Sequence, residues 1–294
     1  MGPALKSEPR MYLQDPAVEK ASYGYLIKAG AVSLLLVLLY FQVMTDLADA
    51  WWNDAAASHG FLVPPLAMYL AWLERKSILA KASRMSGTGL WFVALGCIMF
   101  LVGRLGAEFF LTRISLLVVL TGLIWTFWGP ERLKKLSFPL LLLATMVPLP
   151  AIVWNALAAP LQLFASDVAT TIAQTLGVAV YRDGNIIHLA NISLGVAEAC
   201  SGLHSLSALM ITALLLGFLQ CTSVAMRVLL FALSIPMAIA LNVVRITGTA
   251  VLADYWQDIA FGFYHSFSGW LIFVLGFAGL WLITRLLKRF ERKA

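Results

Sequence analysis

Charged residues are scarce in this chain, and their scarcity decides the class of protein first. Only 12% of the 294 residues are Asp, Glu, Lys or Arg, and 61% are hydrophobic. An ordinary soluble domain is about half apolar and about a quarter charged. Apolar runs of about 15 to 20 residues recur along the sequence, and each can cross a hydrocarbon core of roughly 30 Å as a helix, some with local bilayer thinning. The sequence therefore predicts an all-α, polytopic membrane helical bundle.

About eight transmembrane helices are expected in one membrane domain over residues 26–287, between a cytoplasmic N-terminal tail (1–25) and a cytoplasmic basic tail (288–294). The expected spans are 26–44, 61–73, 88–103, 112–128, 136–154, 203–219, 227–245 and 267–286. The longest external stretch, 155–200, has a pattern that predicts an amphipathic helix over 156–178. A turn at 181–185 and a small hairpin formed by 186–189 and 192–196 are expected to follow it.

The few charges are distributed unevenly between the two sides of the membrane. Lys and Arg gather before the first span, after the second, fourth and sixth, and at the C-terminus, whereas the other side has few of them and many acids. By the positive-inside rule, both termini are cytoplasmic in an inner-membrane, multi-pass protein. This topology explains the net charge of +6 without a nucleic-acid partner, and no nucleic-acid motif occurs.

Cysteine and histidine are also rare, and their spacing argues against a metal or cofactor site. The three cysteines have no zinc-ribbon or CxxC spacing, and the four histidines form no HExxH-like arrangement. We also find no P-loop, dinucleotide fingerprint or Gly-x-Ser-x-Gly motif. Cys97 and Cys221 are expected to be inert packing thiols. Cys200 lies in a polar segment and is expected to be unpaired.

Cys200 is the first candidate catalytic residue, because it directly precedes the sixth expected span. The N–H groups and dipole at a helix N-terminus stabilise an anion, and thiols there ionise more readily. This position suits a nucleophile, although a lone cysteine at a helix end is more often a small packing residue.

Arg245 and His265 are the other two candidates, since helix parity places both on the extracytoplasmic side with Cys200. A guanidinium at the end of a span is costly unless it snorkels or pairs, and it can stabilise negative charge in an acyl-transfer transition state. An imidazole can take the proton of a thiol and return it to a leaving amine. Taken alone, Arg245 is equally well explained as an arginine that snorkels to lipid phosphate, and His265 is more often an interfacial histidine with no chemical role. With Cys200 they are the three groups that cysteine acyl transfer needs.

Further residues are possible supporting groups near these three. His59 opens the second span on the same side, and His204 follows Cys200 by one helical turn, so either histidine competes with His265 as the base. Glu198 is near enough in sequence to orient a side chain. The complete supporting set is Glu198, Ser201, His204, Asn242 and His59.

Five segments in order resemble the exosortase/archaeosortase family of membrane cysteine transpeptidases. They are Ser58-His59-Gly60-Phe61-Leu62-Val63-Pro64, Arg182-Asp183-Gly184-Asn185-Ile186-Ile187, Glu198-Ala199-Cys200-Ser201-Gly202-Leu203, Asn242-Val243-Val244-Arg245-Ile246 and His265-Ser266-Phe267-Ser268-Gly269-Trp270. The resemblance implies that Cys200 is the nucleophile and that Arg245 and His265 occupy the other catalytic positions. A histidine at the third position is similar to the bacterial exosortases.

The resemblance also implies a substrate class that residue chemistry alone does not. Exosortases are thought to process exported proteins whose C-termini carry a short motif such as Pro-Glu-Pro (PEP-CTERM), one transmembrane helix and a basic cluster. A thioester at Cys200 would then be resolved by an envelope acceptor amine or by water. Two other hypotheses remain: a transporter or export component for an envelope polysaccharide, and a catalytically idle scaffold.

Overall fold

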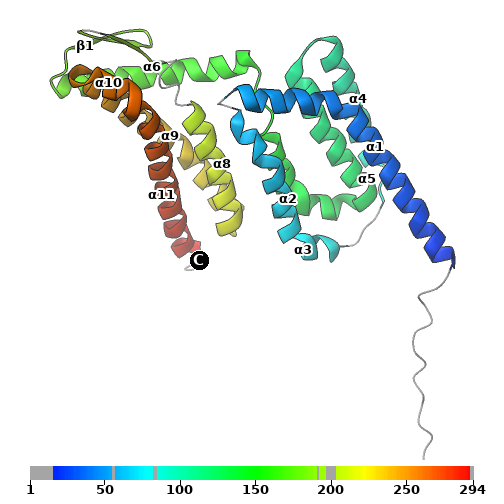
Figure 1. The fold of residues 1–294 in the computed structure, drawn as a ribbon. Coiled ribbons are helices and arrows are strands. Elements are labelled where there is room, and N and C mark those ends of the chain that lie inside the picture. Colours follow the sequence, from blue (N-terminus) through cyan, green and yellow to red (C-terminus); the bar gives the residue numbers. More distant parts are fainter. Residues whose placement is uncertain (1–15, 55–56, 82–84, 191, 197–202, 292–294) are drawn as a thin grey trace, which may run out of the picture. The chain divides into compact units, whose positions relative to one another are not determined.

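The computed structural model describes residues 16–54, 57–81, 85–190, 192–196 and 203–291 (Figure 1). The chain divides into two compact units, Met1–Leu47 and Ala48–Ala294. Helix α1 (Pro16–Asn53) contains the first expected span and begins ten residues before it. Five helical segments among the described residues are long and apolar enough to cross a membrane: Gly30–Asn53, Phe109–Ala144, Ala151–Thr175, Val224–Tyr255 and Phe267–Arg289. The protein is therefore an all-α, multi-pass membrane protein.

Shorter helices account for the other apolar runs of the second unit. The second expected span forms a 3-10 turn η1 (Ser58–Phe61) and helix α2 (Val63–Leu73), which is followed by α3 (Arg75–Leu79). The third forms α4 (Gly89–Leu105). Pro64 and Pro65 lie in the first turn of α2, where a missing N–H costs no helical hydrogen bond.

Helix α4 packs closely against α5 (Phe109–Ala144) through glycines spaced seven residues apart. A Cβ added at Gly89, Gly96 or Gly103 would lie only 2.4–2.5 Å from an atom of Thr126, Val119 or Thr112 of α5. Small residues of this kind let membrane helices approach until their backbones touch.

The prediction of one span over 136–154 is wrong. Within α5 the backbone turns at Gly129 (φ 79°), directly before Pro130, and the helical path then ends at Ala144. Residues 145–150 form a non-helical connection that contains Pro148 and Pro150, and α6 (Ala151–Thr175) begins after it. Proline lacks the N–H that would continue the helix, so two apolar runs that look continuous in sequence become separate helices.

A three-stranded antiparallel sheet follows α6, in the order β1-β2-β3 (Val180–Asp183, Ile186–Leu189 and Ser193–Gly195). The expected hairpin of 186–189 with 192–196 is confirmed as the β2–β3 pair. Part of the segment expected to be a turn forms β1 instead. The turn itself shortens to Gly184 and Asn185, and Gly184 adopts the positive φ of 60° that a two-residue hairpin loop needs.

The last part of the chain is a bundle of α8 (Leu203–Gln220), α9 (Val224–Tyr255) and α11 (His265–Glu291), all in mutual contact (Figure 1). Its core includes Leu209, Ala213, Leu230, Ala238 and Leu280. Helix α9 continues ten residues beyond the expected end of its span, so the prediction that Arg245 ends that helix is wrong. The short α10 (Gln257–Ile259) and the π-helical turn η2 (Ala260–Tyr264) connect α9 to α11.

Candidate functional site

Cys200 lies with Glu198 and Ser201 in residues 197–202, outside the described part of the chain. The elements on either side are described. Strand β3 and Val196 come before this segment, and α8 begins at Leu203, three residues after Cys200. The backbone of His204 belongs to the first turn of α8, but its side chain is not described. The predicted roles of these four residues therefore stay predictions.

The sheet that leads to Cys200 is fixed against α6 and α9. Ile187, Leu194 and Val196 are each at most 1% exposed, in one core with Ala169 of α6 and Ile246 of α9. Val196, the last described residue before the segment that contains Cys200, is thus packed in this core.

Four polar contacts add to this core. Gln174 Nε2 donates to the Val180 carbonyl at 3.0 Å, and Ser166 Oγ donates to the Gly184 carbonyl at 3.2 Å. Arg182 donates to the same carbonyl at 2.8 Å and pairs with Asp167 at 3.0 Å. Three of these contacts attach β1 and its turn to α6, and the bond from Arg182 to Gly184 lies within the hairpin.

Arg245 projects from α9 toward the start of α11. Its Nε donates to Ser268 Oγ at 3.3 Å, and Ser268 is only 1% exposed. A Cβ at the neighbouring Gly269 would lie 3.7 Å from Arg245 Nη2, so α11 presents a small residue to the guanidinium. Sequence reasoning did not name Ser268 as a site residue, although it lies in the last of the five family-like segments.

Tyr264 brings the beginning of α11 to the same turn of α9. A Cβ at Gly248 would lie only 2.1 Å from the Tyr264 hydroxyl oxygen, so the phenol occupies the space that Gly248 leaves open. The backbone of His265 comes directly after Tyr264 and three residues before Ser268. The structure therefore brings Arg245 and the backbone of His265 together, while the His265 side chain is not described.

Asn242 lies one turn before Arg245 and is 7% exposed. Among the described residues its Oδ1 has no hydrogen-bond partner, although its burial separates it from solvent. A buried amide oxygen without a hydrogen-bond partner costs folding free energy.

His59 has a partner elsewhere in the second unit. Its Nε2 donates to the carbonyl of Thr145 at 3.0 Å, and Trp51 Nε1 donates to the carbonyl of Met146 at 2.9 Å. Both bonds stabilise the break between α5 and α6. A Cβ at Gly60 would lie 2.2 Å from Trp51, so the glycine of this turn makes room for the indole. In the described part of the chain, His59 therefore stabilises the connection between α5 and α6.

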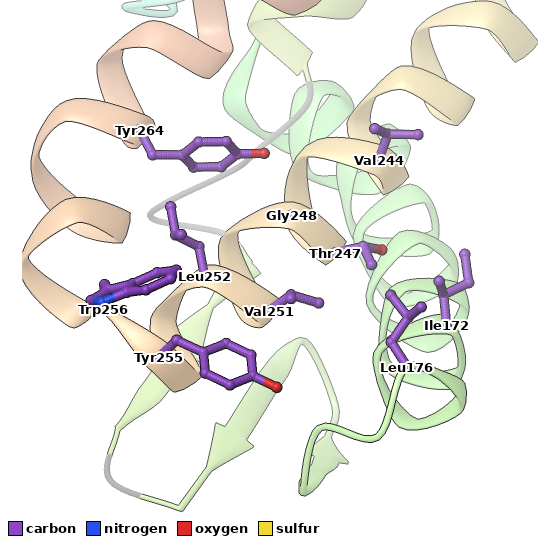
Figure 2. Close-up of a pocket in the computed structure, with 10 residues that line it drawn as sticks. All are labelled: Ile172, Leu176, Val244, Thr247, Gly248, Val251, Leu252, Tyr255, Trp256 and Tyr264. Atoms are coloured by element: carbon purple, nitrogen blue, oxygen red, sulfur yellow. The ribbon is translucent and has the colours of Figure 1, made fainter.

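A groove with a cavity volume of about 780 Å³ lies beside Arg245 on α9 (Figure 2). Three parts of the chain line it: the end of α6, the last third of α9, and the connection to α11. The lining residues are Ile172, Leu176, Val244, Thr247, Gly248, Val251, Leu252, Tyr255, Trp256 and Tyr264. No group of three or more His, Cys, Asp or Glu that could hold a metal ion occurs in the described ranges.

The helices that are long enough to cross a membrane define a multi-pass membrane protein. Within its helical bundle, Arg245 of α9 bonds to Ser268 near the start of α11, which forms a polar site. Residues 51–282 match the family model described as transmembrane exosortase. Because the match covers most of the sequence, the chain belongs to the transmembrane exosortase family. Searches of curated proteins and of solved structures gave no match.

Proposed function

We propose that the protein is a membrane cysteine transpeptidase or endopeptidase that cleaves C-terminal sorting signals of exported proteins. The observation that carries this proposal is the family match over residues 51–282, which includes Cys200, Arg245 and His265. The packing of the start of α11 on α9 at Arg245 supports it, because two of the three positions then belong to one contact region.

In the proposed reaction, His265 takes the thiol proton and the Cys200 sulfur attacks the scissile carbonyl carbon. The guanidinium of Arg245 donates hydrogen bonds to the developing oxyanion. The carbon–nitrogen bond then breaks, and the proton held by His265 passes to the leaving amine. A thioester to Cys200 remains.

An acceptor amine or water attacks this thioester and gives its proton to His265. The carbon–sulfur bond breaks, and the thiolate is regenerated as the new amide or the free acid leaves. The acceptor is thus consumed in the second half of the reaction. Both halves use the same three residues, and no cofactor is needed.

The thiol is the sharpest test of this mechanism. The assay is the size of a tagged host protein that ends in a short motif, an apolar helix and a basic tail, measured in cells that contain each variant. Cys200→Ala is expected to reduce processing to the level seen without the protein, because no other group supplies the sulfur. Cys97→Ala is the matched control, since Cys97 lies within α4, and it is expected to process normally. Normal processing by Cys200→Ala would refute the mechanism.

A further inference from the structure

The start of α11 contacts α9 at two points that lie one helical turn apart. Arg245 Nε of α9 donates to Ser268 Oγ of α11 at 3.3 Å, and three residues further along α9 the Tyr264 phenol packs on Gly248. Residues three or four apart in a helix lie on the same face, so both contacts use one face of α9 and one face of the chain that begins α11. The backbone of His265 lies between the two contacts.

The contact at Gly248 is too close for any other residue. A Cβ there would lie 2.1 Å from the Tyr264 hydroxyl oxygen and 3.1 Å from Cζ, whereas ordinary van der Waals contacts are 3.4–4 Å. Figure 2 shows the Tyr264 ring extending from the connection toward this turn of α9. Glycine is less favourable than alanine in a helix interior, so the geometry of this contact, and not helix stability, accounts for glycine at position 248.

The turn that contains Tyr264 has a distinct backbone geometry. Residues Ala260–Tyr264 form the π-helical turn η2, and α11 begins at the next residue, His265. A π-helical turn holds more residues than an α-helical turn, so it changes the direction in which the following residues face, and such turns occur often at functional sites. Ala260 is fully buried in the core that includes residues of α9. Ala260 at one end and Tyr264 at the other therefore attach η2 to α9.

We propose that Tyr264, packed in the space above Gly248, is a positioning residue that holds the backbone of His265 beside Arg245 in the geometry that the reaction requires. The phenol itself neither donates nor accepts a proton in the reaction. A displacement of about 1 Å can cost about 100-fold in rate, so a contact one residue from the histidine has a direct effect on the chemistry. This inference rests on the proposed function, because it takes the role of His265 from it.

Alkylation of Cys200 tests the position of the base without a substrate. The full chain, with Cys97 and Cys221 replaced by alanine, is reconstituted in lipid nanodiscs and treated with iodoacetamide at about pH 7 and about pH 9.5. A free thiol is mostly protonated at the lower pH and mostly ionised at the higher one, so only the slower reaction depends on a neighbouring base. His265→Ala is therefore expected to lower the rate at neutral pH by about tenfold and to leave the rate at high pH close to that of the parent protein.

Gly248→Ala and Tyr264→Ala are the two variants that disturb the contact. Both are expected to show the pattern of His265→Ala, with slower alkylation at neutral pH and the parent rate at high pH. A bundle that had only loosened would expose the thiol and raise the rate at both pH values, which would overturn the inference. Gly279→Ala is the matched control, because it adds the same methyl group between α11 and α9 at the flexible end of Met237, and it should match the parent protein throughout.

Removal of the clashing atom provides the reciprocal test. Phenylalanine lacks the hydroxyl oxygen, and the ring atom that then lies nearest to a Cβ at position 248 is Cζ, at 3.1 Å, which a small shift accommodates. The double variant of Gly248→Ala with Tyr264→Phe is therefore expected to regain most of the alkylation rate at neutral pH that Gly248→Ala loses. A double variant as slow as Gly248→Ala would show that the contact between the two residues does not hold the base.

The outcomes for the inference and for the proposed function are distinguishable. If His265→Ala keeps the parent alkylation rate at neutral pH, the proposed role of His265 is wrong, and the inference about Tyr264 is wrong with it. If His265→Ala is slow but Gly248→Ala and Tyr264→Ala keep the parent rate, the proposed chemistry stands and Tyr264 does not position the histidine.

Discussion

At the scale of single residues, Arg245 combines a high cost with a defined geometry. A guanidinium within a membrane helix costs at least a few kcal/mol unless it finds polar partners. Here it is half-buried, and Ser268 accepts from its Nε. The Ser268 hydroxyl accepts this hydrogen bond without neutralising the charge of the guanidinium. This arrangement suits a group that stabilises a transient oxyanion.

Arg245→Lys is expected to lower the rate of processing by about 100-fold, because the lysine ammonium lacks the planar fork of donors and one lost oxyanion donor costs about that much. Arg285→Lys is the matched control: Arg285 stacks on Trp281 near the other end of α11 and should tolerate the change. Initial rates at equal protein levels are the measurement. Near-normal rates for Arg245→Lys would show that the arginine does not take part in the chemistry.

Ser268→Ala examines how the guanidinium is held. The variant retains the Arg245 charge and removes the hydroxyl that accepts from Arg245 Nε at 3.3 Å, so we expect its effect to be smaller than that of Arg245→Lys. A larger effect than that of Arg245→Lys would assign the main role to Ser268 itself.

At the scale of elements, the α4–α5 pair depends on glycine for its close approach. Gly96 faces Val119, and a Cβ there would lie 2.5 Å from its side chain and 2.9 Å from its backbone nitrogen. Gly122 of α5 is similarly close to Val93 of α4. At these glycines the backbone of one helix contacts the backbone of the other, so a side chain added there cannot be accommodated by a rotamer change. The two helices would have to move apart.

Gly96→Val is therefore expected to destabilise the protein by roughly 1–3 kcal/mol, the usual cost of overpacking. Leu95→Val is the matched control because Leu95 is 49% exposed on the same helix. Thermal unfolding in detergent, followed by helical circular dichroism, measures the difference. Equal midpoints for the two variants would mean that α4 and α5 do not pack as described.

At the scale of the whole molecule, the charge distribution predicts which side each connection occupies. The outer face of the β-sheet carries the exposed Ser193, whereas Lys134 lies in the basic segment after the kink of α5. Cysteines at these two positions, in a background with the three native cysteines replaced by alanine, provide a direct test. A membrane-impermeant thiol reagent should label Ser193→Cys in intact cells and Lys134→Cys only after lysis. The reverse pattern would overturn the predicted topology.

The sequence predicted helices well where one apolar run makes one helix, as in 88–103 and 267–286. It failed at 136–154, because an average over apolar residues does not register the positive φ of Gly129 or the prolines at 148 and 150. It also missed β1, whose polar residues resemble a turn until pairing with β2 buries Val180. In the site, Arg245 was singled out by its cost in lipid, but its partner Ser268 lies 23 residues away.

The sequence by itself determined that the chain is a membrane protein, because this follows from its composition. It also determined which residue types can perform acyl transfer, because these stand in short motifs. Only the tertiary structure decided that α9 extends past Arg245, that Tyr264 and Ser268 pack against it, and that an apolar groove forms beside them. These features depend on the close packing of segments far apart in the chain, and no local pattern encodes the distance between them.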